Sequence, residues 1–67
     1  MKAWILINNG SVWDVVFNGA KAKELIEDFF GKIPKGIDIE KFKPYRCVTF
    51  SINKEIITVT CMNITGE

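Results

Sequence analysis

An Asn-Gly pair near the start of the chain places the strongest constraint on its fold. Asn9 and Gly10 separate two runs rich in β-branched and aromatic residues, at positions 3–7 and 12–17. Both residues tolerate the positive φ angles of a two-residue type I′ turn. The sequence therefore predicts a β-hairpin over residues 2–17.

Regular pairing across this turn sorts the hairpin side chains onto two faces. One face carries Trp4, Leu6, Trp13, Val15 and Phe17. The opposite face carries Ala3, Ile5, Ile7, Val12, Asp14 and Val16, of which only Asp14 is charged. Contiguous exposed apolar surface usually marks an interface, so these six residues are the candidate protein interface. Either a partner covers them, or the chain itself does.

The next segment has the pattern of an amphipathic helix. Apolar residues recur with the spacing i, i+3, i+4, i+7 and i+8 at Ala22, Leu25, Ile26, Phe29 and Phe30. Asn18 suits the N-cap, and Gly31 suits the left-handed position that ends a helix. The acidic residues of this segment fall on its outer side, which predicts a solvated face and no acid–base pair.

A second hairpin is predicted over residues 45–64, with its turn at Asn53 and Lys54. Alternation places one apolar set on a common face: Val48, Phe50, Ile52, Ile57, Val59 and Cys61. The other face is mostly hydroxyl-bearing: Tyr45, Cys47, Thr49, Ser51, Ile56, Thr58, Thr60 and Met62. This division is typical of an antiparallel sheet with one face in water.

These elements predict one α+β domain over residues 1–67, with the order ββαββ and the helix packed on one face of an antiparallel sheet. The sequence does not determine how the two hairpins join. The connection 31–44 contains one predicted helical turn at residues 38–42, capped by Asp38. Its apolar residues are sufficient to cover the back of the first hairpin: Ile33, Ile37, Ile39 and Phe42.

Several kinds of chemistry lack the residues they need. The 67 residues include no histidine and two cysteines, Cys47 and Cys61, without a Cys-x-x-Cys motif. No glycine-rich phosphate loop is present. We therefore expect no catalytic residue, no metal and no cofactor. We also expect two free thiols in a cytoplasmic protein with no membrane partner, because the first apolar run is too short for a signal peptide or a membrane span.

A nucleic-acid partner is the alternative to a protein partner. The net charge is only +1, but one segment carries five cations against Asp38 and Glu40: Lys32, Lys35, Lys41, Lys43 and Arg46. Residues 43–50 resemble the RNP1 strand of RNA-recognition motifs in their Lys, Tyr, Val and Phe positions. Pro44 replaces the glycine of that strand, and Cys47 replaces the exposed aromatic residue that stacks on a base.

The complete pattern of elements resembles small single-domain proteins of phages and mobile elements, among them anti-CRISPR proteins and other host-defence inhibitors. The resemblance spans the chain and rests on architecture, so it implies no site residues. It implies a protein that binds a host complex and blocks one of its surfaces. Our first hypothesis is such a non-enzymatic protein-binding module. The others are a small nucleic-acid-binding protein and a structural subunit that pairs with a second copy of itself.

Overall fold

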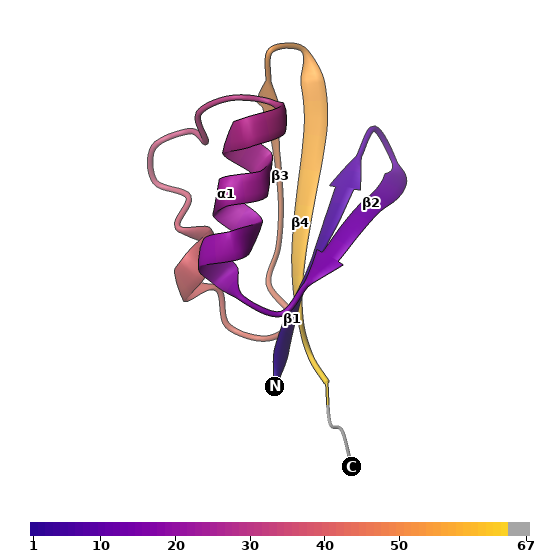
Figure 1. Cartoon of the computed structure of the whole chain (residues 1–67), viewed down its shortest axis with the longest axis vertical. Coiled ribbons are helices and arrows are strands. Elements are labelled where there is room, and N and C mark those ends of the chain that lie inside the picture. The colour runs from indigo at the N-terminus through magenta and orange to yellow at the C-terminus, as the bar shows by residue number, and fades with distance from the viewer. Residues whose placement is uncertain (65–67) are drawn as a thin grey trace.

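The computed structural model describes residues 1–64, which form one four-stranded antiparallel sheet and one helix (Figure 1). The elements in chain order are β1 (Lys2–Asn8), β2 (Ser11–Val16), α1 (Gly19–Phe29), the 3₁₀ turn η1 (Ile39–Lys41), β3 (Cys47–Ile52) and β4 (Glu55–Asn63). The helix lies between the second and third strands in the sequence, so the predicted ββαββ fold is confirmed.

The two hairpins join through their long strands. The strand order is β2-β1-β4-β3, so β1 and β4 are central and β2 and β3 are the edges. Strand β1 pairs with β4 along its whole length, from Lys2 opposite Asn63 to Asn8 opposite Ile57. This pairing brings the beginning and the end of the described chain together in the middle of the sheet.

Both predicted hairpin turns are present, with positive φ angles at both central residues, which Asn and Gly favour and Lys54 does not. Asn9 and Gly10 have φ angles of 50° and 87°, and Asn53 and Lys54 have φ angles of 49° and 69°. Side-chain hydrogen bonds also tie the first turn to the second hairpin. The Asn9 amide donates to the Glu55 carboxylate at 3.0 Å, and the Ile56 amide donates to the Asn9 side-chain oxygen at 3.0 Å.

The predicted register of the first hairpin is wrong beyond Val12. A β-bulge inserts Trp13 as an extra residue, so that Asp14 lies opposite Leu6, Val15 opposite Ile5 and Val16 opposite Trp4. Paired residues share a sheet face, so Asp14 and Val16 belong to the helix side and Val15 to the other side. Phe17, expected beneath the helix, is exposed after the end of β2.

The bulge has a packing reason. The Trp13 ring meets the rings of Phe29 and Phe30 edge-on, at centroid distances of 5.1 and 5.0 Å. These aromatic contacts join β2, the edge strand, to the C-terminal end of α1. They also explain how Phe29, which is largely exposed, still contributes to packing.

Helix α1 begins and ends as predicted. The Asn18 side chain accepts hydrogen bonds from the amides of Ala20 and Lys21 at 2.8 and 3.2 Å, which makes it the N-cap. Gly31 follows the helix with a φ of 129°. Ala22 and Ile26 are fully buried against the sheet.

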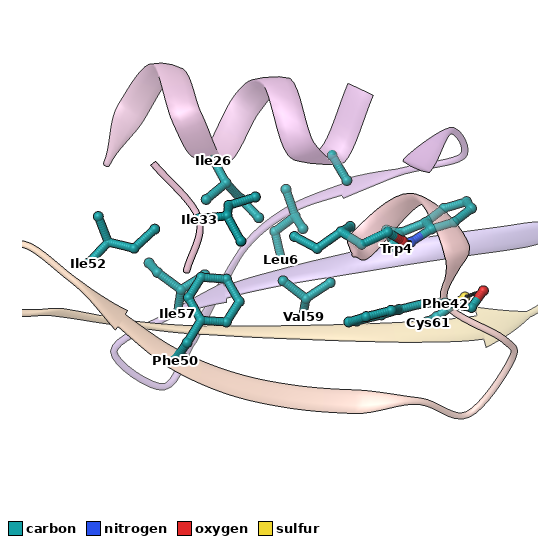
Figure 2. Close-up of a cluster of buried hydrophobic side chains, with 12 residues drawn as sticks. Trp4, Leu6, Ile26, Ile33, Phe42, Phe50, Ile52, Ile57, Val59 and Cys61 are labelled. Carbon is teal, nitrogen blue, oxygen red and sulfur yellow. Dashed lines mark hydrogen bonds between the residues drawn. The ribbon is translucent and has the colours of Figure 1, made fainter. Parts of the chain in front are cut away.

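The connection between α1 and β3 completes the core on the helix side. Ile33, Ile39 and Phe42 are buried in the same cluster as the sheet residues, which Figure 2 shows between the helix and the strands. The Trp4 indole donates to the Ile39 carbonyl at 2.8 Å and so ties η1 to β1. The expected Asp38 cap is absent, since its side chain makes no capping hydrogen bond.

Tyr45 departs from its predicted place at the start of a strand. It lies in a turn with a φ of 71°, and β3 begins two residues later at Cys47. From there the predicted pairing holds, with Val48 opposite Val59 and Phe50 opposite Ile57. Within residues 1–64, the one α-helix is too short to cross a membrane.

Candidate functional site

The side of the sheet that faces away from α1 is the candidate interface, and we call it the sheet back. Strand registers assign it twelve residues: Ala3, Ile5, Ile7, Val12, Val15, Cys47, Thr49, Ser51, Ile56, Thr58, Thr60 and Met62. None of them is charged, although 17 of the 67 residues of the chain are Lys, Arg, Asp or Glu. A charge-free face that crosses four strands is the most distinctive surface of the described chain.

The structure brings four of the six predicted interface residues onto this face: Ala3, Ile5, Ile7 and Val12. The expected placement of Asp14 and Val16 is wrong because the bulge moves both to the helix side, and Val16 packs against the core. Val15 replaces them. Because residues 15–17 are all apolar, their alternation carries no information about which face each one occupies.

The sheet back has an apolar half and a hydroxyl half. On the β2–β1 side, Val12 and Val15 are 66% and 41% exposed, and Ile5 and Ile7 beside them are half-buried. On the β4–β3 side, the Thr49 and Thr58 hydroxyls lie 3.0 Å apart. Hydroxyls that bond to one another leave fewer polar groups for water or a partner to satisfy.

Nothing within residues 1–64 covers this face. The connection 31–44 was one of the two candidates for covering it, but its apolar residues are in the core on the opposite side of the sheet (Figure 2). Ala3 is the exception to the exposure of the sheet back, since it is 1% exposed beside its pairing partner Met62. The surface is therefore open to another molecule, and Val12, Val15 and Ile56 are its exposed large apolar side chains.

The two cysteines lie on opposite sides of the sheet and are both free, as predicted. Cys47 is exposed on the sheet back, where it accepts a hydrogen bond from the Thr60 hydroxyl at 3.3 Å. Cys61 is buried on the helix side, and burial raises the pKa of its thiol above the ordinary 9.0, against a smaller opposing effect of Lys2. No cluster of three potential metal-ligating side chains occurs in the part of the chain that the structure describes.

Three of the five predicted nucleic-acid contacts line one groove. Lys41, Lys43 and Arg46 line an open groove of about 530 Å³ together with Tyr45, whereas Lys32 and Lys35 lie outside this lining. The sequence pattern predicts Tyr45 at the start of a strand, within the stretch that resembles RNP1. The Pro44-Tyr45 pair was the available signal, because proline favours the second position of a turn.

Comparisons of the chain with protein-family models, with curated proteins and with solved structures find no match.

Proposed function

We propose that this chain is a non-enzymatic binding module that contacts another protein through the sheet back. The observation that carries the proposal is the absence of charge from all twelve positions of an uncovered, four-stranded face. Residues at the centre of protein interfaces are depleted in charge, whereas solvated surfaces are not. A role without catalysis fits the absence of histidine from the sequence.

The edges of the sheet support the same role. Edge strands usually carry charges or prolines that prevent contact with other proteins. Here β3 has no charged residue and β2 has only Asp14, whose carboxylate accepts a hydrogen bond from the Val15 amide at 2.8 Å. The β3 border of the sheet back is therefore open to a partner, whereas Asp14 and the bulge protect the β2 border.

The size of the face favours a different protein over a second copy of this chain. Nine residues of β4 span about 30 Å, and four strands spaced about 4.8 Å apart give a face on the order of 500 Å². Two copies stacked face to face bury less than the roughly 800 Å² per partner of a standard interface. A larger partner reaches past the border to contact Phe17, which is exposed beyond the end of β2.

The partner chemistry follows from the face. It is an uncharged, mainly apolar protein surface that matches the valines and isoleucines of β1 and β2 and tolerates the threonines of β4. A host-defence inhibitor of the type that the architecture resembles acts in this way, by covering a surface that its target needs. The proposal requires no chemical step.

Photo-crosslinking in the native cells tests this proposal. We replace Val12 with p-benzoylphenylalanine, and as a control we replace Ala20, which is exposed on α1 away from the sheet back. We expect a discrete heavier product from the Val12 probe and not from the Ala20 probe. Identical products from both positions, or none from Val12, contradict the proposal. A product of twice the mass of the chain identifies a second copy as the partner.

A pair of lysine substitutions tests whether the crosslinked product depends on the sheet back. Val15→Lys places a cation on the sheet back at a position that is 41% exposed, so the domain should stay folded. Ala20→Lys adds the same charge on the helix. We expect Val15→Lys to abolish the crosslink from position 12 and Ala20→Lys to leave it unchanged, with circular dichroism confirming that both variants are folded.

A further inference from the structure

A groove beside the start of β3 is built from residues that the sheet back does not use. Its volume is about 530 Å³, within the range of small-ligand sites. Ile37, Phe42 and Val48 supply apolar lining, and all three pack in or against the core. The groove therefore has a fixed apolar lining, and its polar side chains come from Asp38, Lys41 and the turn at Lys43–Arg46.

Tyr45 occupies a position in this turn that the backbone disfavours for its residue type. The Arg46 amide donates to the Lys43 carbonyl at 3.2 Å, which closes a turn with Pro44 second and Tyr45 third. The φ of Tyr45 is 71°, a value that glycine or asparagine adopts at much lower cost than a bulky side chain. Backbone strain of this kind is concentrated at functional sites.

The tyrosine ring makes little contact with the rest of the fold, so its packing does not offset the backbone strain. Tyr45 is 73% exposed, and the contact that holds the residue is made by its backbone, whose amide donates to the Cys61 carbonyl at 2.6 Å. A glycine would keep that hydrogen bond. The fold would therefore be more stable with glycine at this position, yet the position carries an aromatic ring that is exposed to solvent.

Three cations, Lys41, Lys43 and Arg46, line the groove together with Tyr45. The Arg46 guanidinium carbon lies 5.8 Å from the centroid of the Phe42 ring, a cation–π contact that orients it. Lys43 is the first residue of the same turn and also lines the groove. The Lys41 ammonium is 3.8 Å from the Asp38 carboxylate, the one acidic side chain among the groove-lining residues that the structure describes.

We infer that this groove binds a nucleotide unit, with its base stacked on Tyr45 and its phosphate held by Lys43 and Arg46. Proteins bind unpaired nucleotides with exposed aromatic rings in basic grooves, since every base has a stacking face and every nucleotide a negative charge. The unit is either a free nucleotide or part of a single strand. This site is separate from the sheet back and does not depend on the proposed function.

Binding of fluorescein-labelled (dT)₁₂ in 50 mM salt, followed by fluorescence anisotropy, tests the inference. We expect saturable binding that weakens with salt, with a log–log slope of about −1.4 for the two phosphate contacts of Lys43 and Arg46. A 12-mer of abasic sites should bind at least about fivefold more weakly, because stacking is lost. Competition with AMP shows whether the ligand is a free nucleotide or part of a single strand. Competition by millimolar AMP indicates a free nucleotide, and competition by unlabelled (dT)₁₂ alone indicates a strand.

Tyr45→Gly separates binding from folding. Removing the ring should weaken (dT)₁₂ binding at least about fivefold. Relieving the strained φ should at the same time raise the melting temperature by about 4 °C or more. Tyr45→Phe keeps the stacking face and should bind like the parent. A merely structural role for Tyr45 predicts no loss of binding in the glycine variant.

Charge variants complete the test. Lys43→Gln combined with Arg46→Gln should flatten the salt dependence by about one unit or more, because two phosphate contacts are lost. Lys32→Gln removes a cation of the same connection outside the groove and should change affinity less than twofold. The inference is wrong if (dT)₁₂ does not bind at 50 mM salt, if the abasic strand binds equally well, or if Tyr45→Gly retains full affinity.

Discussion

The two faces of the sheet come from the same four strands, yet one is a closed core and the other is open. On the helix side, Leu6, Ile57 and Val59 have no exposed surface, whereas Val12 and Ile56 on the sheet back are 66% and 52% exposed. One helix and one connection cover a single face of the sheet, and both lie on the same side (Figure 2). Apart from Ala3, the apolar residues on the other face are exposed or only half-buried, which is why we propose that they bind a partner.

Truncating neighbouring residues of β1 on opposite faces should show this contrast most clearly. Leu6→Ala should cost about 2–5 kcal/mol of unfolding free energy, because it leaves a cavity in the closed core. That is a large part of the stability of a 67-residue domain, at about 0.05–0.15 kcal/mol per residue. Ile5→Ala, on the half-buried sheet back, should cost about 1 kcal/mol. Urea denaturation measures both, and equal losses would show that the sheet back is also core.

Adding a methyl group to each side tests how tightly the covered face is packed. A Cβ on Gly19 would lie 2.7 Å from the Cα of Glu40 and 3.0 Å from the Trp4 ring. Gly19→Ala should therefore destabilise the domain by about 1–3 kcal/mol by separating α1 from η1. Val15→Ile enlarges an exposed side chain on the sheet back and should be nearly neutral. If thermal melts show that Gly19→Ala is as stable as the parent, the covered face is not tightly packed at this position.

The contrast between the open face and the closed core should also appear in the reactivity of the two cysteines and in the pH dependence of stability. Thiol titration should find two free thiols after denaturation, with Cys47 reacting quickly in the folded protein and Cys61 only on opening. Burial raises the pKa of Cys61 above 9.0, so the folded state keeps a proton that the unfolded state releases at alkaline pH. This contribution to stability is complete below pH 9 and is lost as pH rises through the folded-state pKa. Cys61→Ala should remove that component of the pH dependence, whereas Cys47→Ala should not.

The smallest effect is expected at the hydroxyl pair of the sheet back. Thr49→Val or Thr58→Val alone leaves one hydroxyl without its 3.0 Å partner, but water can replace that partner on an open face. Each single change should cost less than about 1 kcal/mol, and the double replacement should be within about 0.5 kcal/mol of the parent. A double-mutant cycle by urea denaturation measures this coupling. A loss above 2 kcal/mol would mean that the hydroxyls are buried in the protein in solution.

Local chemistry made several parts of the fold predictable. The Asn9-Gly10 turn, the Asn18 cap and the alternation from Val48 to Phe50 each depend on residues adjacent in the chain. The candidate interface was predictable only in part. Its β1 residues follow from strict alternation in a central strand, but its β2 residues depend on where the bulge lies.

The sequence by itself determined the elements and their order, because turns, caps and periodic apolar patterns act over a few residues. Tertiary structure decided what lies against what. The β1–β4 pairing joined the hairpins, the rings at the end of α1 drew Trp13 into a bulge, and the 31–44 connection packed beneath the helix. In each case, several surfaces of similar hydrophobicity could have packed together. Which of them pack together depends on shape complementarity among residues distant in the chain, and a local sequence pattern does not contain that information.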